Sequence, residues 1–286
     1  MHSAGPDEAC CFQVLSERLA AINQHWKQRW RMENPGLLFR GIARAHHALD
    51  PSLLRPPYPR DDADLAGVEN SLWAEFQLRS MPLLGRSVRT AWEATFIMQQ
   101  HGLPTRLLDW SRSLAVAAHF AVRDLEVEED GAVWIMAARH LMELRGGLGV
   151  WRTMVGDPSI EGLAVREDAA GLAEFNAQTP VPLSPHQVDP RMIAQQGMYT
   201  LHSFARGALE QLAKQDRATH GPACFLQKIT IPADCKVAFR LELPVIAGVK
   251  EDTLFPDLGG FARGFAQEWW EISQGQRGAQ GRTSAP

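Results

Sequence analysis

The chain has 286 residues, of which 45% are apolar and 22% are charged, which is typical of a folded globular protein. Its 29 basic and 33 acidic side chains give a formal net charge of -4. This charge excludes a chain that is basic throughout and binds nucleic acid by overall charge, although a local basic patch remains compatible with it. The N-terminus lacks a signal-peptide pattern, and no apolar run approaches the ~20 residues that span a bilayer. We therefore expect a soluble, cytoplasmic protein that does not contact membranes.

Cysteine and histidine spacing predicts no metal site. His46 and His47 are adjacent, but no third ligand lies at helical spacing, so we expect surface histidines. The cysteines have neither the spacing of a zinc site nor that of a disulfide framework, which predicts reduced thiols at all four positions: Cys10, Cys11, Cys224 and Cys235.

The first part of the chain predicts helices separated by one short strand. Apolar residues recur every three to four positions after Phe12, until Asn34-Pro35-Gly36 interrupts the pattern. An apolar run then stops at Arg40 and Gly41, so we expect a buried strand whose end presents an arginine. The elements expected up to residue 100 are a helix over 12–30, a strand over 37–39, an irregular connection over 51–64, and helices over 64–81 and 90–100.

The middle of the chain predicts a short strand followed by a thin helix. Gly102 and Pro104 close the preceding helix in the usual order of glycine before proline. A strand is expected over 105–110, and Ser111 is placed to cap a helix that runs to about residue 122. Four alanines make this helix thin enough to approach a sheet closely: Ala115, Ala117, Ala118 and Ala121.

The second half of the chain is less regular, because glycine, proline and acidic residues between about 145 and 190 follow no clear period. β-Propensity and apolar spacing predict the remaining elements. These are strands over 132–136 and 224–231, a hairpin-like or bulged β segment over 191–202, and helix over 234–270 with breaks at Pro244 and at 255–257.

Together these elements predict the α+β class, with a compact mixed sheet flanked by helices and preceded by an N-terminal helix. We expect a helical lead over 1–36, one α+β domain over 37–272 and a disordered tail over 273–286.

Residues suited to chemistry concentrate between Gln99 and Ser111, around a turn that leads into a strand. Arg106 and Asp109 are expected at the ends of that strand, where a buried charge must be paired or functional. One interpretation is structural, with a salt bridge from Asp109 to Arg106 or to Arg40 that fastens the sheet. The other interpretation is a ligand site.

The tripeptide Phe39-Arg40-Gly41 and the segment 100–111 resemble the FRG domain family, which is named after that tripeptide. Segments 191–200 and 254–258 are also similar to family motifs, so the resemblance runs from about residue 37 to about 265. Ile42 departs from the family pattern, which commonly has a polar residue there, so a role of that side chain does not transfer to this chain. The resemblance identifies a family but implies no specific activity.

The order of these segments also resembles ADP-ribosyltransferases of the arginine-serine-glutamate type. The resemblance implies a similar fold with NAD as substrate, an arginine that holds the diphosphate and a hydroxyl that shapes the nicotinamide pocket. Gln195 and Gln196 stand where those enzymes place a glutamate, and Asp109 is the carboxylate available in its place. The candidate residues are Asp109, His101 and Gln195 for catalysis, and Arg40, Gly41, Thr105, Arg106, Ser111 and Gln196 for nucleotide binding.

Three functions remain open. The first is an NAD-dependent ADP-ribosyltransferase or NAD glycohydrolase, in a toxin or phage-defence context, with a protein or nucleic acid as acceptor. The second is a non-catalytic nucleotide- or nucleic-acid-binding module, which the missing glutamate favours. The third is a phosphate-ester hydrolase in which His101 and Asp109 act as an acid and base pair on a phosphate held by Arg40 and Arg106.

Overall fold

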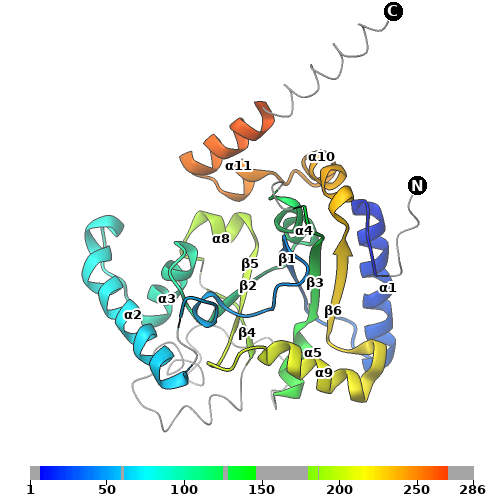
Figure 1. The fold of residues 1–286 in the computed structure, drawn as a ribbon, viewed down its shortest axis with the longest axis horizontal. Helices are drawn as coiled ribbons and strands as arrows, with labels where there is room; N and C mark the ends of the chain where they lie inside the picture. Colours follow the sequence, from blue (N-terminus) through cyan, green and yellow to red (C-terminus); the bar gives the residue numbers. More distant parts are fainter. Residues whose placement is uncertain (1–6, 59–60, 125–127, 146–179, 186, 270–286) are drawn as a thin grey trace, which may run out of the picture.

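Figure 1 shows the fold of the computed structural model, which describes residues 7–58, 61–124, 128–145, 180–185 and 187–269. Six strands form one sheet in the order β4-β5-β2-β1-β3-β6, and each pairing between neighbours is antiparallel. This sheet with its flanking helices confirms the predicted α+β class, with antiparallel pairing where a mixed sheet was expected.

The elements in chain order are α1 (Phe12–Trp30), β1 (Leu37–Ile42), η1 (Ser52–Leu54), α2 (Asp62–Leu84), α3 (Ala91–Gln100), β2 (Leu107–Ser111), α4 (Leu114–Val122), β3 (Gly131–Ala137), α5 (Ala138–Leu144), β4 (Val181–Leu183), α8 (Pro190–Ala194), β5 (Gly197–Leu201), α9 (Ala208–His220), η2 (Gly221–Ala223), β6 (Leu226–Ile231), η3 (Ala233–Cys235), α10 (Lys236–Ala247) and α11 (Glu251–Leu254). Residues 258–269 are also helical.

Strand β1 lies in the middle of the sheet and carries the first candidate residues. It pairs with β3 along its whole length, so that Arg40 lies opposite Trp134 and Gly41 opposite Val133. The prediction that the strand ends at Arg40 and Gly41 is wrong, because β3 supplies partners as far as Ile42. Arg40 therefore projects from within a strand whose pairing with β3 continues before and after it in the sequence.

Helix α4 packs very closely against the middle of the sheet. A Cβ atom added to Gly41 would overlap the carbonyl oxygen of Ala117, and one added to Gly131 would overlap that of Ala121. Only glycine fits at these two positions, because the atoms in the way belong to the helix backbone and cannot rotate aside. The predicted thin, alanine-rich helix is confirmed, and its alanines are buried against the sheet.

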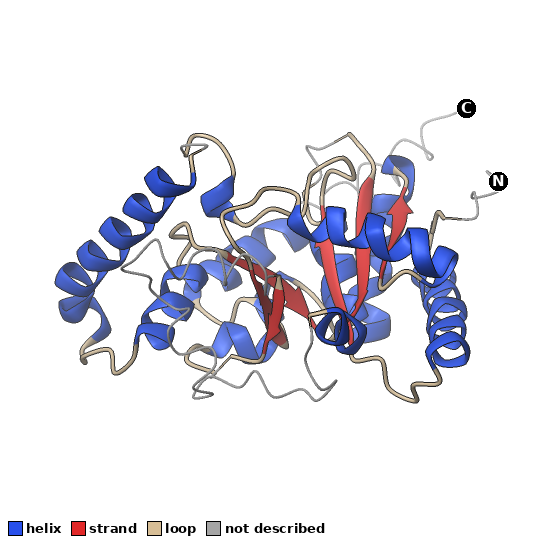
Figure 2. Ribbon diagram, turned by 90° about the horizontal axis from the view of Figure 1, so that it is seen from below, coloured by secondary structure: helices blue, strands red, loops and turns tan. Residues whose placement is uncertain are grey.

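Apolar cores hold the helices to the sheet. The larger core joins β1, β3 and β6, together with side chains of β2 and β5, to α1, α4, α5, α9 and α10. A second core joins β2, β4 and β5 to α3 and α8. A smaller cluster joins η1 to α2. Figure 2 shows the strands twisting apart between these helices, as expected for a sheet of right-handed strands.

Several local predictions are confirmed. Helix α1 begins and ends at the predicted residues, Phe12 and Trp30. Helix α3 begins directly after Thr90, whose hydroxyl accepts a hydrogen bond from the Glu93 amide at 3.1 Å. Gly102, with a φ of 80°, follows this helix as expected.

Two other local predictions are wrong. The first part of the predicted β segment over 191–202 is helix α8, because the Asp189 side chain caps it and Pro190 occupies its first turn. The expected break at Pro244 is absent, since α10 continues to Ala247 and ends at Gly248, whose φ is 64°. The predicted break at 255–257 is confirmed between α11 and the helical residues that follow.

The expectation of four reduced thiols is wrong for two of them. A disulfide joins Cys10 to Cys235, whose Cα atoms are 4.9 Å apart, and so ties the residues before α1 to η3. Cys11 and Cys224 are free. Local spacing gave no sign of this bond, because its partners are 225 positions apart in the sequence.

None of the helices in the described ranges combines the length and the apolar character needed to cross a lipid bilayer. The tail predicted over 273–286 lies outside the described residues.

The substitution Gly41→Ala tests the contact between β1 and α4. We expect it to lower the free energy of unfolding by about 2–3 kcal/mol, because the added methyl group meets helix backbone that only a shift of α4 relieves. Urea-induced unfolding measures this change.

Gly67→Ala is the matched control, because no atom lies near the position of its Cβ within α2. Alanine in place of a glycine inside a helix should raise the free energy of unfolding by about 0.5–1 kcal/mol. Equal effects of the two substitutions would contradict the close approach of α4.

Candidate functional site

A cleft opens beside the middle of the sheet, where β1, β2, α3, α4 and α8 converge. Its volume is about 300 Å³, at the lower end of the ~300–1,000 Å³ that small-molecule sites typically measure. The lining combines charged, amide and aromatic side chains with the backbone of α4: Phe39, Arg40, Gly41, Gln99, Gln100, Asp109, Trp110, Ser111, Val116, Ala117, Phe120, Arg123, Gln195 and Phe255.

Arg40 is the charged centre of this cleft. Its Nη1 donates a hydrogen bond to the backbone oxygen of Asp109 at 2.7 Å and lies 3.7 Å from the Asp109 carboxylate. The side chain of Arg40 is 18% exposed, and its Nε is buried without a hydrogen-bond partner among the described residues. Burial lowers the pKa of the Arg40 guanidinium, while Asp109 opposes the change and Arg55 reinforces it. The protein thus satisfies this cation only in part, which favours binding of an anion.

Asp109 lies beside Arg40 with its carboxylate held in place. Gln99 donates from Nε2 to Oδ2 of Asp109 at 2.9 Å. The Thr105 hydroxyl accepts from the Leu107 amide and donates to Oε1 of Gln99, so the Gln99 amide is fixed with its nitrogen toward the carboxylate. The Asp109 side chain remains 57% exposed. Its negative charge is therefore oriented by the protein and accessible from the solvent.

Of the two salt bridges that the structural interpretation allowed for Asp109, the structure contains the one with Arg40. Because Asp109 is more than half exposed, a pair of this kind stabilises the fold by only about 0–1 kcal/mol. Fastening the sheet is thus a weak reason for this arrangement.

Ser111 and Gln195 join β2 to the turn after α8. The Ser111 hydroxyl donates to the backbone oxygen of Gln195 at 2.7 Å and accepts from the Ser113 amide at 2.9 Å. The Gln195 side chain donates to the backbone oxygen of Leu254 at 3.1 Å. The prediction that Ser111 caps α4 is wrong by two residues, because the Ser113 hydroxyl accepts from the Val116 amide and forms the cap. Ser111 instead fixes Gln195 at the cleft.

Phe255 forms an aromatic wall of the cleft. Its ring meets Phe120 edge-on, with 6.2 Å between the ring centroids. The guanidinium groups of three arginines lie 5.0–5.8 Å from the centre of the Phe255 ring, within the range of cation–π contacts: Arg123, Arg191 and Arg263.

Arg123 is the second cation in the lining, and Glu251 of α11 orients it. Oε1 of Glu251 accepts hydrogen bonds from Arg123 at 2.9 Å and from Arg263 at 2.7 Å. Burial raises the pKa of Glu251, but hydrogen bonds from His119 and Arg263 and the charge of Arg123 outweigh burial and lower it to about 2. Glu251 therefore stays ionised at neutral pH and holds Arg123 at the edge of the cleft.

Thr105 and Arg106 lie behind the cleft rather than in its lining. Arg106 is 1% exposed, and its Nε lies 2.7 Å from both carboxylate oxygens of Glu69 on α2. Its guanidinium also lies over the ring of Phe204 at 5.0 Å. A buried pair of this kind belongs to the fold, because loss of one partner leaves an uncompensated charge. Thr105 reaches the cleft only through its hydrogen bond to Gln99.

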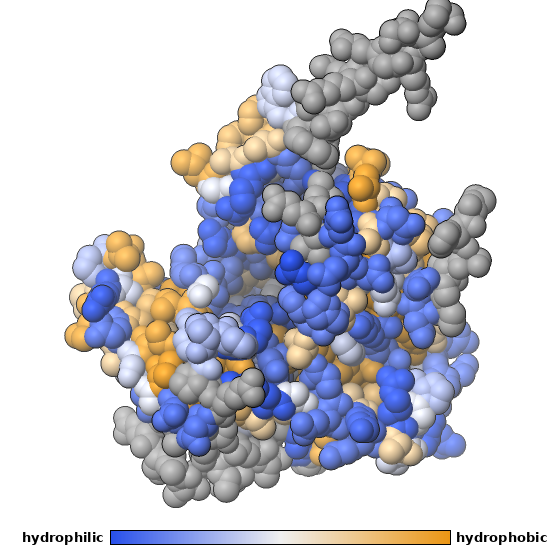
Figure 3. Space-filling view, viewed as in Figure 1, coloured by the Kyte–Doolittle hydropathy of each residue, from blue (hydrophilic) through white to orange (hydrophobic). Residues whose placement is uncertain are grey.

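His101 and Gln196 also lie outside the lining. His101 lines a second, largely apolar pocket between α2 and α3, and Figure 3 shows apolar side chains gathered over α2 on this face. Gln196 is exposed, with a φ of 50°, in the turn between α8 and β5. Five of the nine candidate residues therefore meet in one cleft: Arg40, Gly41, Asp109, Ser111 and Gln195.

Sequence reasoning did not assign a role to several lining residues. Gln99 and Gln100 lie within the segment singled out from the sequence, and Phe255 lies within the motif over 254–258. Phe120 and Arg123 are three positions apart at the end of α4 and so share one face of that helix. Only the tertiary contact with α11 reveals that this face borders the cleft.

Residues 36–130 match the family model of the FRG domain. The chain contains an FRG domain. The match includes the whole of β1, α3, β2 and α4, which carry most of the cleft lining, whereas Gln195 and Phe255 follow the matched FRG residues. The resemblance seen in the sequence is thereby confirmed over 36–130, and its continuation to about 265 stays a prediction. No curated protein and no solved structure matches the chain.

A series of hydrogen-bonded side chains behind the cleft ends at His202, a neutral histidine. Trp110 Nε1 donates to the Thr200 hydroxyl at 3.0 Å, and that hydroxyl lies 2.9 Å from Nε2 of His202. The Thr200 hydroxyl therefore accepts from the indole and also lies within hydrogen-bond distance of the buried imidazole. Burial lowers the pKa of His202 to about 3, with further contributions from Arg40 and Arg106.

His202 should make the fold sensitive to acid. The pKa of His202 is about 3 in the folded protein, against an ordinary value of 6.5. Between pH 6.5 and pH 3, the imidazole is therefore protonated in the unfolded chain but not in the folded protein. Protonation thus favours the unfolded state, and the free energy of unfolding falls as the pH is lowered. We expect this group to remove about 2–3 kcal/mol from the free energy of unfolding between pH 6.5 and about pH 4.5. Urea unfolding of the parent and His202→Gln at both pH values measures the difference, and equal pH slopes would contradict it.

Proposed function

We propose that the protein binds NAD in the Arg40 cleft and cleaves it there, by ADP-ribosyl transfer or by hydrolysis. The observation that carries this proposal is the convergence of Arg40, Asp109 and Gln195 on one cleft. An arginine binds a diphosphate, an amide binds ribose hydroxyls, and a carboxylate stabilises positive charge on the sugar.

The reaction requires a negative charge beside the ribose. When the bond between ribose carbon and nicotinamide nitrogen breaks, its electron pair stays with the nicotinamide, which leaves as a neutral molecule, and the ribose gains oxocarbenium character. Asp109 is proposed to stabilise that charge, because its carboxylate is oriented by Gln99 and open to the cleft. Water or an acceptor nucleophile then attacks the same carbon and loses a proton, which gives hydrolysis or transfer.

The cleft lining supports this ligand in charge and in shape. Arg40 and Arg123 supply two cations, and Phe120 and Phe255 supply flat apolar surfaces for the nicotinamide ring. With about 300 Å³, the cleft is expected to enclose the nicotinamide, its ribose and the adjacent phosphate. The adenosine half then lies outside it.

A non-catalytic nucleotide-binding module is the second candidate. Among the described residues of the lining, Asp109 is the one carboxylate. The lining also contains three carboxamides, which bind hydroxyl groups but cannot neutralise a cation: Gln99, Gln100 and Gln195. Under this alternative the nucleotide binds and stays intact. The phosphate-ester hydrolase gains no support, because His101 and Asp109 line different pockets.

Arg40→Gln tests binding. We expect the affinity for NAD to fall by about 30-fold or more, equivalent to about 2 kcal/mol, because the amide cannot replace a charge-assisted pair with phosphate. Isothermal titration calorimetry measures the loss. Arg79→Gln is the matched control, since Arg79 is an 80% exposed arginine of α2. Unchanged affinity of Arg40→Gln, or a parent that binds no NAD, would refute the proposal.

Asp109→Asn tests catalysis. We expect nicotinamide release to slow by about a hundredfold while NAD affinity stays close to that of the parent, because the amide keeps the shape but loses about 3 kcal/mol of charge stabilisation. Chromatography of released nicotinamide and a thermal melt on the same preparation are the measurements, with the exposed Asp64→Asn as control.

Two outcomes separate the alternatives. Full activity of Asp109→Asn with a lowered melting temperature would assign Asp109 to the scaffold. Binding of NAD by the parent without any nicotinamide release would establish the non-catalytic module.

A further inference from the structure

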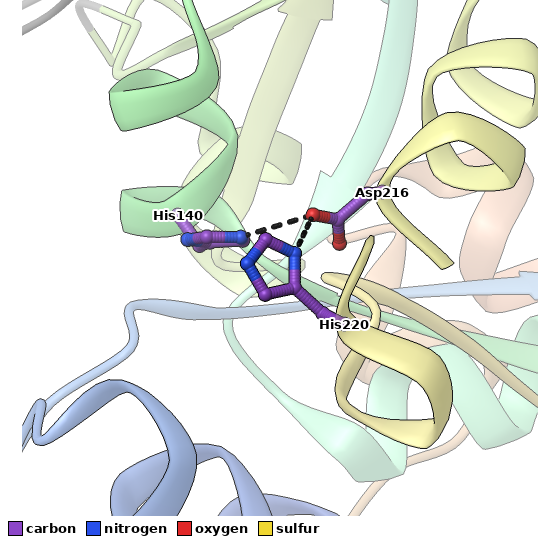
Figure 4. A group of neighbouring side chains, drawn as sticks. All are labelled: His140, Asp216 and His220. Carbon is purple, nitrogen blue, oxygen red and sulfur yellow. Dashed lines mark hydrogen bonds and ion pairs between the residues drawn. The ribbon is translucent and has the colours of Figure 1, made fainter. Parts of the chain in front are cut away.

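His140, Asp216 and His220 form a compact cluster away from the Arg40 cleft. Figure 4 shows the three side chains pointing toward one another, from α5 and from the end of α9. Oδ1 of Asp216 lies 3.2 Å from Nε2 of His140 and 2.7 Å from Nδ1 of His220. One ligand atom from each residue lies within 4.8 Å of the other two. In Figure 1, α5 and α9 lie at the opposite end of the sheet from α8 and α11.

Neighbouring residues orient His140 and Asp216 by hydrogen bonds to the atoms that face away from the cluster, an arrangement common among metal ligands. Nδ1 of His140 lies 3.4 Å from the carboxylate of Glu143, so the nitrogen facing away from the cluster has an acidic partner. Oδ2 of Asp216 accepts from the Phe225 amide at 2.8 Å, which leaves Oδ1 directed into the cluster. Metal-bound histidines usually pair their second nitrogen with a carboxylate or carbonyl in this way. The His140 ring also stacks on Trp30 at 4.1 Å, which fixes its plane.

The spacing of the cluster is compatible with a tetrahedral ion after one small movement. Zinc binds histidine nitrogen and carboxylate oxygen at about 2.0–2.2 Å, so neighbouring ligand atoms lie roughly 3.3 Å apart. The distance from His140 to Asp216 already matches this value, whereas His220 must shift away from Oδ1 of Asp216 and toward the His140 nitrogen. His220 is the last residue of α9 and is 20% exposed, so it is the member of the cluster most able to move.

We propose that His140, Asp216 and His220 bind one Zn²⁺, with water at the fourth position. Two imidazoles and one carboxylate are ligands that suit zinc, and three protein ligands leave one position open. The ion would join α9 to α5, two helices that are otherwise held by packing and by the hydrogen bond between Asp216 and His140. None of these three residues lines the Arg40 cleft.

Equilibrium dialysis of the chelator-treated full chain against Zn²⁺, followed by elemental analysis, tests the proposal. We expect one Zn²⁺ per chain for the parent, and affinity reduced at least tenfold for His220→Asn. The control is the double variant His46→Asn with His47→Asn, which removes an exposed histidine pair and should bind as the parent does. A parent that binds no Zn²⁺, equal affinity of His220→Asn, or loss of binding in the control would each overturn the proposal.

X-ray absorption at the zinc edge tests the same site in the parent and does not depend on how any variant folds. The expected spectrum has two imidazole ligands with oxygen in the remaining positions. Sulfur in the coordination sphere would instead place the ion on a cysteine, such as the free Cys11 or Cys224, and would overturn the proposal.

Discussion

Direct contact between the backbone of α4 and strands β1 and β3 determines where the residues of the cleft lie. It exists because Gly41 and Gly131 present no side chain to the helix, and because α4 is built largely of alanine. This contact places Phe120 and Arg123 of α4 beside Arg40 of β1. The tripeptide for which the family is named thus supplies a charged group and, in the next residue, the space that lets a helix reach it.

The cleft combines a partly satisfied arginine with an oriented carboxylate. Arg40 uses Nη1 for both of its contacts with Asp109, and its Nε has no partner among the described residues. Gln99 holds Asp109 from the other side. In a protein that used these residues only for stability, we would expect the arginine to form a close ion pair with a carboxylate, as Arg106 does with Glu69. The contrast between the two arginines is the main physical reason to assign binding to Arg40.

Local signals predicted the elements better than they predicted the site. Helix α1 follows from apolar spacing, which acts within a few residues, and α3 lies where a helix was expected over 90–100. Arg40 was expected at a strand end because the apolar run over 37–39 stops there, but pairing with β3 carries the strand past it. The roles of Arg123, Phe255 and the disulfide depend on contacts between distant segments, and no local pattern encodes such contacts.

The proposed function requires that Arg40 contacts the nucleotide. Nitrogen-edited NMR of arginine side chains, recorded while NAD is titrated into the protein, observes this group directly. We expect the Nε–H signal of Arg40 to shift and saturate with NAD, while that of Arg106, paired with Glu69 behind the cleft, stays close to its starting position. An Arg40 signal that remains unchanged when NAD is bound would show that Arg40 does not contact the nucleotide.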